Sequence, residues 1–289
     1  MTSLDKRLTP ARPDLADERL RGLVEAARYV PGEPRRVIAP SAPLRREPYP
    51  DAPLDTEALM GEPVAVYDEH EGYAWAQLGT DRYVGYVPTE ALGPAASPPT
   101  HRVTALRTFI YPGPNLKLPQ VGFLSLGAGV TPAEARNEYV RLSTGGWVFA
   151  EHLGAAEAHA QDFVAVAERL VGAPYLWGGK TSLGLDCSGL VQLSLAMAGS
   201  AAPRDADMQQ ATLGTEVDRS SGLRRGDLVF WRGHVGIMLN ETRLLHANGH
   251  HMAVAIEPLA EAEIRIRQKS FGPITGVRRL PGRAQAPHA

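Results

Sequence analysis

The hydrophobic period of the chain changes near residue 156, and this change limits the possible folds more than any other feature. Between about residues 36 and 153, apolar residues come in short alternating runs that glycine, proline and aspartate separate. Such runs are typical of strands and hairpins in small β-barrels. After residue 156, apolar residues recur at three- and four-residue spacing, which indicates helices. We therefore predict small β-domains followed by a domain that contains helices.

Two segments of the β-rich part end in the same way. The sequences GYVPTEAL and GWVFAEHL each place glycine, an aromatic residue and valine ahead of a glutamate and a leucine. We interpret this as a duplication, with one domain over residues 36–95 and another over residues 100–155. The shared ending resembles the last strand and short helical turn of bacterial SH3 domains. That resemblance implies domains that bind cell-wall peptide or form one side of an adjoining active site. A spacer role is the alternative.

The two ends of the chain are assigned separately. Residues 1–35 are predicted to be an N-terminal helical segment that packs on a neighbouring domain. Its helix would run from Asp14, which can cap a helix after Pro13, to Ala27. Residues 283–289 are expected to be a tail.

The remaining domain, residues 157–282, has an α+β pattern. A helix is predicted from Phe163 to Val171, and a second helix begins at Cys187 and ends at Gly199. An antiparallel sheet should follow, built from the strands DLVFW, VGIML, RLLHAN, MAVAIEPL and ITGVRRL.

Composition excludes several classes of partner. The chain of 289 residues has 44% hydrophobic and 21% charged residues, which is ordinary for globular proteins. Its net charge of −2 gives no electrostatic reason to bind nucleic acid. No stretch of about 18 apolar residues predicts a membrane span, so we expect neither a nucleic-acid nor a membrane partner. The single cysteine excludes an intrachain disulfide.

That cysteine, Cys187, lies at the predicted start of a helix, directly after Asp186. The amino terminus of a helix favours an anion, and the thiolate is the nucleophilic form of cysteine. A buried structural cysteine is the alternative. His234 begins a predicted strand and is the expected general base, while His246 on the next strand suits a residue that orients it. The same three residues could instead hold zinc with an open position, although we expect neither a metal nor a cofactor.

Three segments together carry a specific resemblance: PYLWGGKTSLGLDCSGLVQ, RRGDLVFWRGHVGIML and LLHANG. They are similar to the motifs of the NlpC-type cysteine peptidases of bacterial cell-wall metabolism. The resemblance implies a circularly permuted papain-like fold, preceded here by two SH3-like β-barrels. It also implies that Cys187 is the nucleophile, His234 the general base and His246 the residue that orients it.

The domain order narrows the resemblance to the γ-D-glutamyl-L-diamino acid endopeptidases, also called dipeptidyl-peptidase VI. Those enzymes cleave the bond between γ-D-glutamate and the diamino acid of murein stem peptides, and they require a free L-Ala amino terminus. The third catalytic residue is then His rather than Asn. The resemblance implies that Tyr175, Asp186 and Ser188 bind the substrate.

A free ammonium needs an anionic partner, and Asp186 beside the nucleophile can provide one. Asp186 could equally serve only as a helix cap. Glu57 and Tyr83 of the first SH3-like domain are weaker candidates for closing the site, with ordinary surface positions as the alternative. Tyr175 could instead be a packing residue, and Trp177 is expected to be one. The segment PRDADMQQ, with Arg204, Asp205 and Gln209, resembles a loop near the substrate groove of the family. We instead predict that it is the solvated start of a helix.

The expected function is hydrolysis of murein tri- and tetrapeptides during cell-wall recycling. The amino terminus lacks the apolar core of a secretory signal, so we expect a cytoplasmic protein, with export behind a trimmed signal peptide as the alternative. A monomer is expected. The alternatives are a murein amidase or acyltransferase of the same fold and a non-catalytic cell-wall-binding protein. The diamino acid of the substrate stays open.

Overall fold

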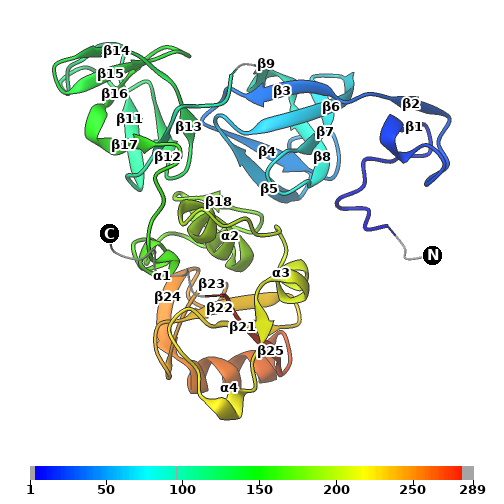
Figure 1. The fold of residues 1–289 in the computed structure, drawn as a ribbon, viewed down its shortest axis with the longest axis vertical. Coiled ribbons are helices and arrows are strands. Elements are labelled where there is room, and N and C mark those ends of the chain that lie inside the picture. Colours follow the sequence, from blue (N-terminus) through cyan, green and yellow to red (C-terminus); the bar gives the residue numbers. More distant parts are fainter. Residues whose placement is uncertain (1–3, 96, 282–289) are drawn as a thin grey trace, which may run out of the picture. The chain divides into compact units, whose positions relative to one another are not determined.

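The computed structural model describes residues 4–95 and 97–281, so the predicted tail lies outside the described residues. It divides into two compact units (Figure 1). Unit 1 comprises Met1–His159 and Trp177–Gly184, and unit 2 comprises Ala160–Leu176 and Leu185–Ala289. The chain thus leaves unit 2 once, for an eight-residue segment, and then returns to it.

The predicted helix from Asp14 to Ala27 is wrong. This region forms β1 (Leu15–Asp17), the 3₁₀ turn η1 (Glu18–Leu20) and β2 (Arg28–Val30), with β1 and β2 parallel. The carboxylate of Asp17 accepts hydrogen bonds from Arg19 and from the Tyr67 hydroxyl, which fixes a single turn. As expected, the segment packs on a neighbouring domain, because Leu15 is buried against Tyr67 and Trp75.

The first β-module forms one sheet with the order β5-β4-β8-β7-β6-β3-β9, and its neighbours are antiparallel. Its core contains the fully buried side chains of Leu44, Ala76, Leu78 and Val87. The elements are β3 (Glu33–Val37), β4 (Ser41–Arg45), β5 (Leu54–Leu59), β6 (Pro63–His70), β7 (Tyr73–Leu78), β8 (Val84–Pro88), η2 (Thr89–Ala91) and β9 (Leu92–Pro94).

The second β-module consists of three small sheets, β13-β10-β17, β11-β12 and β14-β15-β16. Its core includes Val103, Leu124, Leu142 and Val148. The elements are β10 (His101–Val103), β11 (Arg107–Ile110), β12 (Gly122–Ser125), β13 (Gly129–Val130), β14 (Pro132–Arg136), β15 (Tyr139–Leu142), β16 (Trp147–Phe149), η3 (Ala150–His152) and β17 (Leu153–Ala155).

The repeated motif has the same local structure in both modules. Each copy forms a strand, a 3₁₀ turn and a final strand that pairs with the first strand of its module, β9 with β3 and β17 with β10. Both copies need glycine, because a Cβ on Gly85 would lie 2.4 Å from Leu44, and Gly146 has φ +77°. The two copies thus agree in local structure, and the duplication of the whole domain stays a prediction.

Unit 2 has the predicted α+β pattern. Its antiparallel sheet has the order β20-β25-β21-β22-β23-β24. The strands are β20 (Thr215–Glu216), β21 (Leu228–Trp231), β22 (His234–Met238), β23 (Arg243–Asn248), β24 (Ala253–Pro258) and β25 (Ile274–Arg279). The helices are α1 (Phe163–Glu168), α2 (Cys187–Met197), α3 (Ala206–Thr212) and α4 (Leu259–Lys269), with η4 (Arg219–Ser221) between α3 and β21.

Helices α2 and α4 lie on opposite sides of this sheet (Figure 1). Helix α4, which the sequence analysis did not predict, buries Leu259, Ala262 and Ile266 against the sheet residues Met238 and Leu244. Side chains alternate along a strand, so His234 shares the α4 face with Met238 on β22, and His246 shares it with Leu244 on β23. None of the helices among the described residues is long and apolar enough to cross a membrane.

Candidate active site

Cys187 is the first residue of α2, as predicted, and Asp186 is its N-cap. The Asp186 Oδ1 accepts the Gly189 N–H at 2.7 Å, which fixes the start of the helix. Cys187 is only 8% exposed. Burial and the nearby Asp186 raise the pKa of its thiol to about 12, against the opposite effect of hydrogen bonds from the Val235 and Ser188 backbone. The thiol therefore carries its proton at neutral pH.

The hydrogen bond from the Val235 backbone places the sulfur of Cys187 beside the start of β22, whose first residue is His234. The His234 ring is 3% exposed and stacks on Phe271, with the ring centroids 5.3 Å apart. Burial, followed by the charges of His246 and Arg265, lowers the pKa of His234 to about 3, although Glu257 acts in the opposite direction. The imidazole is therefore neutral and can accept a proton.

His234 and His246 lie in direct contact, as the sequence predicts for a base and the residue that orients it. The His234 Nε2 and the His246 Nδ1 are 2.8 Å apart, and His246 is completely buried. The contact uses the Nε2 of His234, so the Nδ1 of His234 does not bond to His246. The contact agrees with the predicted pairing of the two histidines, while the catalytic roles of Cys187, His234 and His246 stay predictions.

Two further residues of this cluster, Glu257 and Arg265, were not predicted from the sequence. Glu257 on β24 lies 2.7 Å from the His246 Nε2, and Arg265 on α4 donates to both carboxylate oxygens of Glu257 at 2.6 Å. A charged residue in the otherwise apolar strand MAVAIEPL was a signal that could have indicated Glu257. The spacing of Leu259, Ala262 and Ile266 was a helix signal.

Arg204 and Gln209 are buried, so the prediction of a solvated helix start is wrong for both. Arg204 is 1% exposed and donates to both carboxylate oxygens of Asp186, at 2.9 and 2.6 Å. It also donates to the Ser188 hydroxyl at 2.9 Å. Gln209 donates to the Ser188 and Pro203 carbonyl oxygens. These bonds hold the loop before α3 against the first turn of α2, which begins at Cys187.

A cavity of about 310 Å³ in unit 2 is lined by Tyr175, His234, His246 and Phe271, among others. Tyr175 is therefore near the two histidines, and burial, followed by the charges of Cys187 and Asp186, raises its pKa. Trp177, which was expected to pack, is instead 65% exposed and belongs to unit 1.

Glu57 and Tyr83 also belong to unit 1, whereas Cys187 and the histidines belong to unit 2. The Glu57 Oε2 accepts the Lys180 backbone N–H at 2.9 Å. Tyr83 is 5% exposed and lies in the core of the first β-module, so it is not an ordinary surface residue. A substrate-binding role for either residue stays a prediction.

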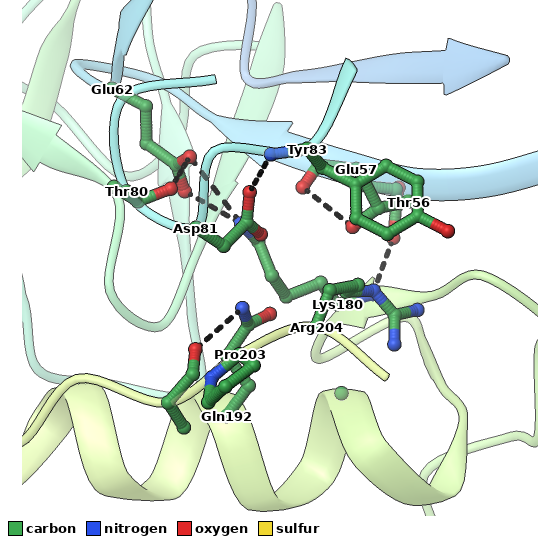
Figure 2. A network of polar contacts seen from close by, with 12 residues as sticks. Thr56, Glu57, Glu62, Thr80, Asp81, Tyr83, Lys180, Gln192, Pro203 and Arg204 are labelled. Atoms are coloured by element: carbon green, nitrogen blue, oxygen red, sulfur yellow. Dashed lines mark hydrogen bonds and ion pairs between the residues drawn. The ribbon is translucent and has the colours of Figure 1, made fainter. Parts of the chain in front are cut away.

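The segment Trp177–Gly184 is fixed within unit 1 by Lys180, which lies on β18 (Lys180–Thr181). The Lys180 Nζ lies 3.0 Å from Glu62 and 4.0 Å from Asp81, and it is almost completely buried (Figure 2). The Thr80 hydroxyl donates to Glu62 at 2.8 Å. The chain then continues through β19 (Gly184–Leu185) into unit 2.

The second β-module holds the same segment through serine contacts. The Ser125 Oγ accepts the Ser182 backbone N–H at 2.9 Å, and the two hydroxyls are 3.2 Å apart. The peptide just ahead of the cysteine motif is thus part of unit 1, although the sequence analysis placed it in the domain of residues 157–282.

The described part of the chain does not support the alternative in which Cys187, His234 and His246 hold zinc. No group of three or more His, Cys, Asp or Glu side chains there is placed to hold a metal ion. His234 and His246 instead bond to each other.

The raised pKa of Cys187 predicts how iodoacetamide reacts with this single cysteine. Because only the thiolate reacts, the rate should be low at pH 6 and should rise about tenfold per pH unit up to pH 10. A small free thiol, with a pKa near 8.5, serves as the control, because its reaction rate should stop rising with pH above about pH 9. A rate that is constant between pH 5 and 8 would show a thiolate paired with a histidine cation instead.

Comparisons with known proteins identify relatives of both parts of the chain. The model of the NlpC/P60 family matches residues 172–270, and that of the bacterial dipeptidyl-peptidase SH3 domain matches residues 44–92. The chain is 30% identical to dipeptidyl-peptidase 6 of Lysinibacillus sphaericus over 267 residues, which cover 83% of this chain and 97% of that protein. It is also 30% identical to a γ-D-glutamyl-L-lysine dipeptidyl-peptidase of Bacillus subtilis over 53% of this chain and 55% of that protein.

Solved structures show the same fold. An NlpC/P60 family protein from Bacillus cereus superimposes with a TM-score of 0.70 at 19% identity, covering 86% of this chain and all of that one. The circular permutation and the SH3-like character of the second β-module stay predictions. The sequence match over nearly the whole length of a relative, together with the two family models, shows that this chain belongs to the NlpC/P60 family and carries a bacterial dipeptidyl-peptidase SH3 domain ahead of its NlpC/P60 domain.

Proposed function

We propose that this protein is a cysteine peptidase that hydrolyses the bond between γ-D-glutamate and the diamino acid of murein stem peptides with a free L-Ala amino terminus. The main observation is that Cys187, at the start of α2, lies beside the first residue of β22, where His246 bonds to the neutral imidazole of His234. The names of the relatives, which are peptide hydrolases, support the reaction class.

In the proposed reaction, the sulfur of Cys187 attacks the γ-glutamyl carbonyl carbon while Nδ1 of His234 takes the thiol proton. The tetrahedral intermediate collapses to a thioester, and His234 returns the proton to the departing amine of the diamino acid. Water then attacks the thioester with His234 as the base, which releases the dipeptide and restores the thiol. The amino-terminal end of α2 favours the negative charge that develops on the carbonyl oxygen.

Because Arg204 forms an ion pair with Asp186, Asp186 is not an isolated negative charge that waits for the substrate ammonium. The guanidinium already compensates the Asp186 carboxylate and fixes its orientation through two hydrogen bonds. We propose that Asp186, with Ser188 and Tyr175, binds the substrate as a preoriented acceptor rather than as an isolated charge. The Arg204 side chain would act as a positioning residue.

A requirement for a free amine also defines where the substrate comes from. Stem peptide still linked to glycan carries a lactyl amide in place of the ammonium, so it would lose this contact. We therefore propose released tri- and tetrapeptides as substrates and a recycling role in the cytoplasm. The monomeric state stays a prediction.

Two peptides that differ only at the amino terminus test the proposal. L-Ala-γ-D-Glu-diamino acid should be cleaved with a kcat/KM at least about 30-fold above its N-acetylated form, because losing a buried charge contact costs about 2 kcal/mol or more. Mass spectrometry of the products, with lysine and diaminopimelate forms as substrates, identifies the bond and the diamino acid. Equal rates for the two peptides would exclude the free-amine requirement.

The Cys187→Ala variant is the matched control for the chemistry. It should lose at least about 1,000-fold in turnover, since no nucleophile remains to form the thioester. Retained hydrolysis by this variant would exclude Cys187 as the nucleophile. Wild-type protein that binds intact murein and cleaves neither peptide would instead point to a binding protein.

A further inference from the structure

The contact between His234 and His246 leaves the direction of its hydrogen bond open. A neutral imidazole has one nitrogen that donates and one that accepts. The 2.8 Å contact between the His234 Nε2 and the His246 Nδ1 can therefore form in two ways. If His234 donates, its Nδ1 has a free lone pair and can act as a base. If His246 donates, the proton of neutral His234 is on Nδ1, and that nitrogen cannot accept the thiol proton.

We propose that Glu257 selects the productive direction, as a positioning residue that fixes the tautomer of His246. This inference rests on the proposed function, in which His234 is the base. A carboxylate only accepts hydrogen bonds, so the Glu257 Oε1, 2.7 Å away, requires the His246 Nε2 to carry the proton. The Nδ1 of neutral His246 then accepts, and His234 donates to it through Nε2. Nδ1 of His234 is left with its lone pair.

The strand register and the docking of α4 bring the side chains of His246, Glu257 and Arg265 together. His246 pairs with Ala255 and Leu244 pairs with Glu257 on the neighbouring strands β23 and β24. His246 and Glu257 are thus diagonal neighbours on one face of the sheet. Helix α4 follows β24 directly, and the burial of Ala262 and Ile266 docks it on that same face.

Arg265 on α4 keeps Glu257 ionised and oriented. It donates to both carboxylate oxygens, and Glu257 is 7% exposed. Burial alone would raise the pKa of Glu257, but the hydrogen bonds from His246 and Arg265 outweigh burial and lower it. His251 is a further titratable group near Glu257, because its Nδ1 lies 3.9 Å from the Glu257 Oε1.

The guanidinium also limits the effect of the carboxylate on His246. A lone carboxylate would favour the imidazolium form of His246, in which both nitrogens donate. The Arg265 charge offsets Glu257, and burial lowers the pKa of His246 despite its bond to Glu257. His246 therefore stays neutral with an accepting Nδ1. An Asn in this position would need no such support, because its carbonyl oxygen always accepts.

A double-mutant cycle separates this role from a merely structural one. Glu257→Gln can present an N–H to the His246 Nε2, so we expect kcat to fall about 100-fold with little change in KM. In the His246→Asn background, where there is no tautomer to fix, the same substitution should lower kcat less than about threefold. Equal losses in the two backgrounds would overturn the proposal. Glu261→Gln, which changes an exposed carboxylate on α4, is the matched control and should leave kcat unchanged.

A second measurement reads the tautomer without any substrate. Long-range ¹H–¹⁵N NMR of the Cys187→Ala protein should show the His246 proton on Nε2, and the Glu257→Gln substitution should move a measurable fraction of it to Nδ1. An unchanged pattern would contradict the proposal. If the wild-type protein cleaves no stem peptide, the proposed function fails, while this spectrum still reports whether Glu257 sets the tautomer.

Discussion

Replacing Arg204 by methionine should lower the free energy of unfolding by about 3–5 kcal/mol, which is the cost of removing one partner of a buried ion pair. The Arg204 side chain is 1% exposed and that of Asp186 is 11% exposed, with 2.6 Å between the Nη2 and Oδ2 atoms. Methionine retains most of the apolar volume but leaves the Asp186 carboxylate buried without its guanidinium. Urea denaturation, with hydrogen exchange of the α2 amides, measures the loss.

The double variant Arg204→Met with Asp186→Asn is the control for this interpretation. It removes both charges while the Asn side chain can still cap α2. We expect it to recover more than half of the lost stability. If the double variant is as unstable as the single one, the cost arises from lost packing of the Arg204 side chain and not from the uncompensated charge.

The second large effect is expected at Lys180. Lys180→Met should destabilise unit 1 by about 3 kcal/mol or more, because the Asp81 side chain is completely buried and that of Glu62 is 13% exposed. Both carboxylates would lose the ammonium. Hydrogen exchange should become faster throughout the segment Trp177–Gly184, whose attachment depends on this side chain.

Lys117→Met is the matched control, because Lys117 is an exposed lysine of the same unit. Its unfolding free energy should change by less than about 0.5 kcal/mol. Unchanged hydrogen exchange in the segment of the Lys180→Met protein would show that the Glu57 and Ser125 contacts alone hold the segment.

The parts of the fold that depend on local pattern could be predicted from the sequence. Helix α2 follows from its apolar residues and its Asp186 cap, and strand β23 has the bounds of the predicted strand RLLHAN. The prediction of a helix after Asp14 was wrong. The hydrogen bond between Asp17 and Tyr67 and the burial of Leu15 outweighed the amphipathic pattern of the sequence. In that segment tertiary contacts decided between two local structures.

The charged network of the candidate site could not be predicted in this way. An arginine in a polar loop is usually solvated, and Arg204 is buried only because Asp186 lies opposite it in space. Glu257 and Arg265 come from a strand and a helix that meet only after α4 docks. The identities of Cys187, His234 and His246 came from motifs, whereas the groups that set their protonation depend on three-dimensional pairing.

The eight residues Trp177–Gly184 have a consequence for how such a protein can be rearranged during evolution. A fusion that joined unit 2 to a foreign amino-terminal domain near residue 160 would carry this segment along, because it lies inside the stretch of sequence that encodes unit 2. Its lysine would then lack Glu62 and Asp81, and its serine would lack Ser125. A new amino-terminal domain joined at this boundary would therefore have to supply its own partners for Lys180 and Ser182.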